Sequence, residues 1–443
     1  MNIQSAITTL AELAAASKAQ AFDIVGYDSF SESVEVFEQK ISNTEIQSSA
    51  ALGVRVFCDQ RPGLAFTERL TPEALKICLA DAISHTQLTD PVEYSVAEPQ
   101  TAIDTKFDHL SPDFERVALS DLADFARKLE SETRSRDARI ENVPYTGAGR
   151  SAATSFFLNS KGVAYQQTHQ EFSAYTAAVA AAGEQKKMGF YSNSRPSFAE
   201  LLPLDFAGIA ARRTLEQLGA APVKAGEYRV LFSNRVAGQI LSIYQSAYFA
   251  DAAQRGQSRL KGRLGERIAS PLLTITSAAH DPKLKGSRAR DAEGSPTRDI
   301  TVVEAGTFTN FLYNLESASK DKTKSTGNAV RSIGSKAATG FKNMVVQPGK
   351  DTAAALTGSG RVLLIDKLEG AAGCSAVSGE MSIGAQGFLY ENGERVQPVD
   401  RITLSSNIFE MLQNIEAISN EYNDQYGSVR VPDLLVGKIS VAG

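Results

Sequence analysis

The stretch "AAPVKAGEYRVLFS" (residues 220–233) divides the chain into two parts. It follows a helical pattern that stops at Gly219, and its first half has the small, polar and proline residues of a connection. Its second half, "EYRVLFS", has the composition of a strand. A chain of 443 residues is also longer than one typical domain. We therefore predict two domains, residues 1–221 and residues 222–443.

The first domain begins with a helical pattern and continues with strand-like runs. Isoleucine and leucine recur at helical spacing in residues 1–20, which predicts an amphipathic helix rather than a signal peptide. Four short β-like runs within residues 22–59 predict an antiparallel meander. Further helices are predicted at residues 71–87, 111–132 and 204–219, and a hairpin turn at residues 159–162.

The second domain is predicted to be rich in strands. From Pro271 onward, short β-like runs alternate with glycine-rich turns. Helices are predicted at "GQILSIYQSAYFADA" (residues 238–252) and at "SNIFEMLQNIEAIS" (residues 406–419). The sequence thus predicts an α+β fold, with an N-terminal antiparallel sheet and helices followed by a C-terminal β-rich domain with a few helices.

Composition argues against several classes of protein. The net charge of −5 and the pI near 5.6 provide no basic field for nucleic acid. No run reaches the roughly 18 apolar residues that a membrane span needs. Cys58, Cys78 and Cys374 are odd in number and widely spaced, which argues against a disulfide framework and a zinc knuckle. We therefore expect a cytoplasmic protein that binds neither nucleic acid nor membrane.

Common catalytic motifs are incomplete. "GAGRSA" (residues 147–152) has the glycine spacing of a dinucleotide fingerprint, but a β-like run follows it where that motif needs a helix. There is no phosphate-binding P-loop, and the glycines around Ser382 do not form a nucleophile elbow. The four histidines stand in polar contexts without an evident acidic partner, and we predict surface or loop positions for them: His85, His109, His169 and His280.

Two other features admit a catalytic and a structural interpretation. Cys374 in "GAAGCSAVSGE" has small neighbours that leave it accessible, but no base stands near it, so an inert cysteine competes with a nucleophile. Asp291 and Glu293 in "DAEGSPT" precede a glycine and a proline, so a turn competes with a catalytic pair.

Ordered segments across the chain resemble the TldD/PmbA family. In the second domain they are "GRLGERIASPLLTI", "DAEGSPT", "VVEAGTFTNFLYNLESASK", "STGNAVRS", "KNMVVQPGKD" and "VSGEMSIGAQGFLYENGE". In the first domain, "ALGVRVFCDQRPGLAFTERLTPEAL" and "FLNSKG" fit the same family, so the resemblance covers nearly the whole chain. The second residue of "DAEG" departs from the family, which often has a second aspartate there.

The resemblance distinguishes two kinds of subunit. TldD-type members carry HExxxH, whose two histidines bind zinc and whose glutamate serves in catalysis, with a cysteine further along as another ligand. PmbA-type (TldE) members lack that motif. In this chain the positions of the first histidine, the glutamate and the second histidine are occupied by Ser242, Ile243 and Ala247. Neither isoleucine nor alanine can bind zinc or act as a base. The resemblance therefore implies a PmbA-type subunit without metal or cofactor, and zinc only in a TldD-type partner.

Periodicity supports a packing role for the same helix. Apolar residues recur at i, i+4, i+7 and i+11, which predicts one stripe that faces the core. The stripe consists of Val236, Ile240, Ile243 and Ala247.

The resemblance further implies a heterodimer with a TldD-type metallopeptidase subunit. The complex would degrade or process flexible peptides, including leader peptides of modified peptide natural products, and we expect an extended peptide to pair with a sheet edge. Asn328 and Arg331 in "STGNAVRS" are the predicted peptide or partner contacts. Two alternatives stay open: a metal-independent peptidase that uses Cys374 or Ser382, and a homodimeric peptide-binding scaffold.

Overall fold

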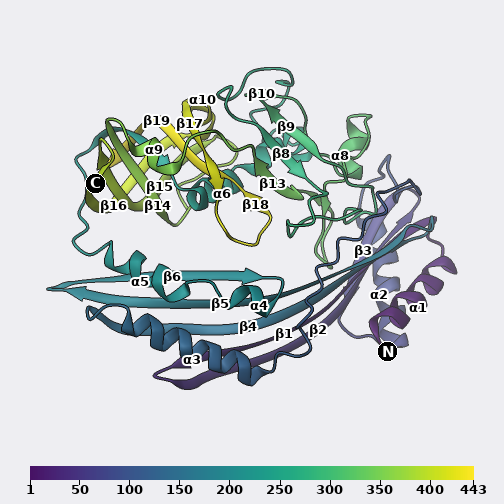
Figure 1. Ribbon diagram of the computed structural model, residues 1–443. Helices are drawn as coiled ribbons and strands as arrows, with labels where there is room; N and C mark the ends of the chain where they lie inside the picture. The colour runs from purple at the N-terminus through teal and green to yellow at the C-terminus, as the bar shows by residue number, and fades with distance from the viewer.

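The computed structural model describes residues 1–443 and has an α+β fold, as predicted (Figure 1). The first part of the chain forms one antiparallel sheet of six long strands in the order β3-β2-β1-β4-β5-β6. The predicted N-terminal antiparallel sheet is therefore confirmed. Its strands are β1 (Ala21–Phe37), β2 (Lys40–Cys58), β3 (Arg61–Thr67), β4 (Ile140–Asn159), β5 (Ala164–Ala182) and β6 (Gln185–Arg195).

The meander has fewer and longer strands than predicted. The four β-like runs in residues 22–59 merge into β1 and β2, and the chain reverses only at Glu38 and Gln39, which both have positive φ. The polar middle of β1 pairs with β2 on one side and β4 on the other. Ladder hydrogen bonds on both sides thus continue the strand through residues that sequence alone marks as a break.

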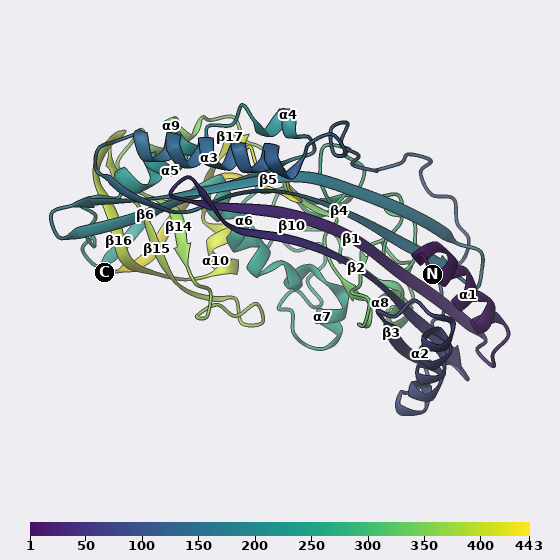
Figure 2. The same cartoon turned by 90° about the horizontal axis from the view of Figure 1, so that it is seen from below.

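All helices of the first part cover one face of the sheet. At one end, α1 (Ile3–Ala15) and α2 (Pro72–His85) pack on β1 and β2. At the other end, α3 (Leu119–Ser135), α4 (Phe198–Leu201) and α5 (Phe206–Leu215) pack together on the same face (Figure 2). The opposite face is turned toward the second part of the chain (Figure 1).

The second part contains a closed ring of strands. β16 pairs with β15 and with β19, so the sheet β16-β15-β14-β7-β19 closes on itself, and β17 adds to β19. Closure removes most of the exposed edges that an open sheet would have. These strands are β7 (Gly226–Phe232), β14 (Arg361–Glu369), β15 (Glu380–Glu391), β16 (Glu394–Asn407), β17 (Ile415–Tyr422) and β19 (Pro432–Ala442).

A smaller sheet and several short elements surround the ring. The smaller sheet has the order β10-β9-β8-β13-β18. Its strands are β8 (Ile275–Ala278), β9 (Ile300–Glu304), β10 (Thr307–Phe308), β13 (Asn343–Val346) and β18 (Val429–Arg430). The other short elements of the second part are α8 (Leu315–Lys320), β11 (Ala329–Val330), β12 (Ala338–Thr339) and α9 (Ala353–Thr357). In the first part, η1 (Thr86–Leu88) follows α2 directly. None of the helices has the length and apolar character of a membrane span.

Both predicted helices of the second part are shorter in the structure. The first is divided into α6 (Asn234–Ile243), η2 (Gln245–Tyr248) and α7 (Ala250–Gln254). The second forms only α10 (Ile408–Gln413), because from Ile415 onward the chain pairs with β19 as β17. From Ile415 onward, residues that have helical spacing in the sequence therefore form a strand, because they pair with β19.

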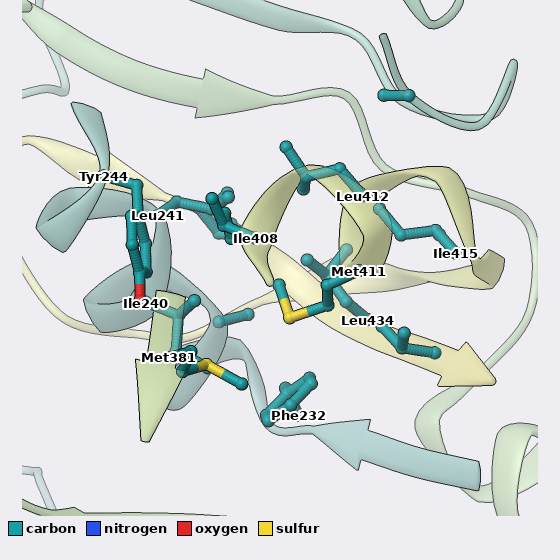
Figure 3. Close-up of a cluster of buried hydrophobic side chains, with 14 of the residues drawn as sticks. Phe232, Ile240, Leu241, Tyr244, Met381, Ile408, Met411, Leu412, Ile415 and Leu434 are labelled. Carbon is teal, nitrogen blue, oxygen red and sulfur yellow. The ribbon is translucent and has the colours of Figure 1, made fainter. Parts of the chain in front are cut away.

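The largest core lies where α6 and α10 meet the ring. In Figure 3, Ile240, Leu241 and Tyr244 point from α6 into a cluster that also contains Phe232 of β7 and Met411 of α10. Full burial of such side chains stabilises the fold by roughly 1.5–3 kcal/mol each. This packing fixes the position of α6, and with it the residues that stand where TldD-type members are expected to have the HExxxH motif.

Candidate functional site

The three positions that correspond to the histidines and the glutamate of HExxxH lie on two different elements. Ser242 and Ile243 are at the end of α6, whereas Ala247 is buried in η2. The Ser242 hydroxyl donates to the carbonyl of Gly238 at 2.7 Å. The predicted core stripe is confirmed at Val236, Ile240 and Ala247, which are buried. Ile243 packs against the same core but is only half-buried, because the helix ends at Tyr244.

A groove of about 490 Å³ runs beside the outer face of α6. The helix contributes Arg235, Gly238, Gln239, Ser242 and Ile243 to the floor. The other walls come from the end of β14 and the following loop, from β15, and from the segment that precedes and includes β18. Their lining residues are Leu368, Gly370, Ala371, Ile383, Asn423, Gln425 and Val429.

The groove does not have the donors of a zinc site. Its lining contains no histidine, cysteine, aspartate or glutamate, and nowhere in the chain do three such side chains gather closely enough to hold a metal. Zinc in proteins is bound by imidazole, thiolate or carboxylate. The residues of this groove therefore do not fit a zinc ion, although a catalytic metal is implied by the family that the sequence resembles.

Cys374 and Ser382 lie near the same helix but without a catalytic partner. Cys374 is partly buried against the core beside the hydroxyl of Tyr244, and Ser382 is exposed on β15. Burial, together with the adjacent thiol, raises the pKa of Tyr244, and its hydroxyl donates to the carbonyl of Glu380 at 2.6 Å. Tyr244 is thus a hydrogen-bond donor that cannot take a proton from the thiol.

Two histidines form a cluster between the two parts of the chain. His109 lies in the connection between α2 and α3, as the predicted loop position allows, but it is buried, and His169 lies in strand β5 rather than in a loop. His109 is 8% exposed, its Nδ1 lies 2.7 Å from the hydroxyl of Tyr426, and its ring centre lies 5.0 Å from that of His169. The Nε2 of His169 lies 3.6 Å from Glu171, which also binds Lys285. Burial, with His169 alongside, lowers the pKa of His109. The other two histidines lie elsewhere, on α2 and stacked on Phe107: His85 and His280.

A buried charge network on strands β1 and β2 also joins the two parts. Arg55 of β2 binds Asp23 of β1 and, at 2.8 Å, Glu293 of the second part. Arg331 binds the other oxygen of Asp23 at 2.6 Å. Burial alone would raise the pKa of Asp23, but the two guanidinium groups hold it below its usual range. We call these four residues the junction network.

The acidic turn is a structural element of this junction. Asp291 accepts hydrogen bonds from the main-chain N–H groups of Glu293, Ser295 and Ala329 at 2.9–3.0 Å, which closes the turn. Burial raises the pKa of Asp291 and lowers that of Lys342, which donates to the carbonyl of Ala329. Of the two interpretations of "DAEG", the contacts of these side chains therefore favour the turn.

The two predicted contact residues are buried inside the chain. The amide of Asn328 donates to Ser277 and to the carbonyl of Gly340, and Arg331 is 1% exposed in the junction network. Contact with a peptide or a partner would require both side chains to become exposed, and so it stays a prediction.

The sequence analysis missed the first-domain members of the junction network. Asp23 and Arg55 stand alone among apolar residues in "FDIVG" and "LGVRVF". A single charge in an apolar strand is rarely left unpaired, so each predicts a buried ion pair. No signal in the sequence identifies the partner.

Comparisons with known proteins agree on one family. The model of the PmbA/TldA metallopeptidase C-terminal domain matches residues 225–443, that of the central domain residues 112–218, and that of domain 1 residues 22–85. Metalloprotease PmbA from Escherichia coli O157:H7 is 28% identical over 98% of this chain and 96% of its own. TldE from Thermococcus kodakarensis has a TM-score of 0.86 at 25% identity, over 99% of this chain and 100% of its own. A Thermotoga maritima protein, described as a modulator of a DNA gyrase, has a TM-score of 0.89 at 24% identity over 100% of both chains, and shows the same fold.

Proposed function

This chain belongs to the PmbA/TldD metallopeptidase family, and from that premise we propose that it is a PmbA (TldE) type subunit. In this proposal it completes a zinc metallopeptidase together with a TldD-type partner and has no zinc site of its own. The observation that supports this most directly is the α6 groove, whose lining offers no zinc-binding side chain. The zinc and the general base of peptide hydrolysis would then belong to the partner.

The proposed substrates are flexible peptides, processed in the cytoplasm. Such peptides can be held through their main chain by an unpaired sheet edge, which tolerates many sequences. The edge of β2 provides one candidate, because β3 pairs only with residues 52–58 and leaves residues 40–51 without a neighbour on that side. Residues 40–49 are exposed, and among them only Lys40 and Glu45 carry charges that would discourage strand addition.

Peptide cleavage by reconstituted subunits tests the proposal. We would measure hydrolysis of a quenched fluorescent unstructured peptide by this chain, by a TldD-type subunit of the same organism, and by their mixture, each with and without chelator. We expect activity only in the mixture and its loss with chelator. Equal activity of the TldD-type subunit with and without this chain would contradict the proposal.

The two alternatives predict different outcomes in the same assay. A metal-independent peptidase would cleave the peptide alone, with chelator present, and would lose activity on Cys374→Ala; we expect no such activity, because no base faces the thiol. A homodimeric scaffold would form stable homodimers that do not bind an added TldD-type subunit. Sedimentation of this chain with and without that subunit distinguishes a scaffold from a heterodimer.

A further inference from the structure

The α6 groove has the length of a short extended peptide. The residues that the helix contributes to its floor span positions 235–243, a rise of about 12 Å. An extended chain advances about 3.3 Å per residue, so the groove matches three to four residues. Its volume of about 490 Å³ lies within the range of ligand-binding clefts.

The walls of the groove carry apolar side chains that solvent reaches. Ile243, Leu368 and Val429 pack against the largest core on one side and are only partly buried. Ile383 lies beneath them, 3% exposed. Covering these surfaces would remove more apolar area from water, which favours a ligand with apolar side chains.

The rim of the groove carries polar groups that have no hydrogen-bond partner within the chain. The side-chain amides of Gln239 and Gln425 make no hydrogen bond within the chain. The carbonyl oxygens of Asn423 and Gln425, two residues of the lining, accept no hydrogen bond either. Amides can donate to and accept from a peptide main chain, and carbonyl oxygens can accept from its N–H groups. These groups suit an extended backbone whose own groups are unpaired.

Charge in the groove is already balanced. Arg235 is the only charged residue of the lining, and its guanidinium binds the carbonyl of Asp366 and lies 3.5 Å from its carboxylate. A charged ligand side chain would lose water without gaining a free counter-charge. The lining therefore favours uncharged side chains.

We propose that the α6 groove binds an extended peptide segment of three to four residues with uncharged, apolar side chains. Only the class of ligand depends on the proposed function; the position follows from the groove itself. The groove shares Asn423 and Gln425 with a cavity lined by His109 and Arg195 of the first part, so a longer peptide would continue toward the space between the two parts.

Fluorescence anisotropy with the full chain alone tests this proposal. The probe is a labelled ten-residue peptide with leucine and valine at its four central positions, compared with a peptide of equal length that has serine and aspartate there. We expect the apolar probe to bind at least tenfold more tightly. Ser242→Trp, which fills the groove, should weaken its binding at least tenfold, whereas Ser84→Trp on exposed α2 should not change it.

Several outcomes would overturn the proposal. They are equal binding of both probes, equal binding by Ser242→Trp, or no binding by the unmodified chain up to millimolar concentrations. If Ser242→Trp does not fold, Gln239→Trp on the exposed side of α6 serves in its place. A dimer that Ser242→Trp dissociates would assign the groove to a second copy instead. Because this assay contains no TldD-type subunit and no zinc, its failure would leave the peptidase result intact, and an inactive mixture would not affect it.

Discussion

The junction network and the α6 groove are built from opposite kinds of side chain. At the junction, two carboxylates and two guanidinium groups are fully buried and neutralise one another. Beside α6, aliphatic and amide side chains line an open groove. The difference teaches that ionisable residues in this chain hold its two parts together, while the groove beside α6 is lined without any side chain of the kind that binds zinc.

The largest expected effect comes from breaking the junction network. Arg55→Ala would leave Asp23 with one partner and Glu293 without its guanidinium, and removing one member of a buried ion pair typically costs about 3–5 kcal/mol. We expect the free energy of unfolding, measured in urea, to fall by that amount. The exposed pair of Lys128 and Glu132 supplies the control: Lys128→Ala should change it by at most about 0.5 kcal/mol. Equal losses of unfolding free energy for Arg55→Ala and Lys128→Ala would show that the junction network stabilises the fold no more than an exposed ion pair does.

A second comparison separates the two faces of α6. Ile240 is fully buried in the core, so Ile240→Ala should cost about 2–5 kcal/mol through lost burial and a cavity. Ile243 faces the groove and is half-buried, so Ile243→Ala should cost about 1 kcal/mol or less. Denaturant unfolding of both variants measures the difference. A larger loss for Ile243 would mean that the groove is closed in solution.

The histidine cluster predicts that stability falls on acidification. Burial lowers the pKa of His109, so the folded chain binds fewer protons than the unfolded chain as pH falls through about 6.5, and stability falls with it. His169, Lys285 and Arg288 also face His109 and oppose its charging, whereas Asp108 favours it. His109→Gln should therefore reduce the loss of stability between pH 7 and pH 5, measured by thermal unfolding across that range.

At lower pH a second loss is expected. Burial alone would raise the pKa of Glu171, but the nearby His169 ring and the hydrogen bonds from Lys285 lower it to about 2. Its contribution is present above its ordinary pKa of 4.5 and is lost as pH falls toward 2. A profile for His109→Gln that matches the unmodified chain between pH 7 and pH 5 would exclude the histidine as the cause.

The smallest expected effect concerns the first HExxxH position. Ser242→Ala removes only a hydroxyl bonded to a carbonyl of its own helix, so stability should change by no more than about 0.5 kcal/mol. Urea unfolding measures this difference, and cleavage by the reconstituted mixture shows separately whether the hydroxyl takes part in the reaction. A marked loss of cleavage without a loss of stability would give the α6 groove a direct part in the reaction.

Much of the fold followed from local pattern. The helices α1 and α2, the antiparallel pairing of the first strands and the hairpin turn after Asn159 are visible in spacing, capping and turn residues. The predictions failed at α6 and α10, where helical periodicity continues beyond the helix. There, contact with strands distant in the sequence outweighs a local preference that is weak by comparison.

By itself, the sequence determined which side chains stand at the three HExxxH positions, because the identity of a side chain fixes what it can coordinate wherever the chain places it. Only the tertiary structure decided that Arg331 meets Asp23 across 308 positions of the chain, and Glu293 meets Arg55 across 238. Each charge is visible in the sequence, but its partner is not. A buried ion pair depends on which elements pack together, and that packing is a property of the whole core rather than of any one segment.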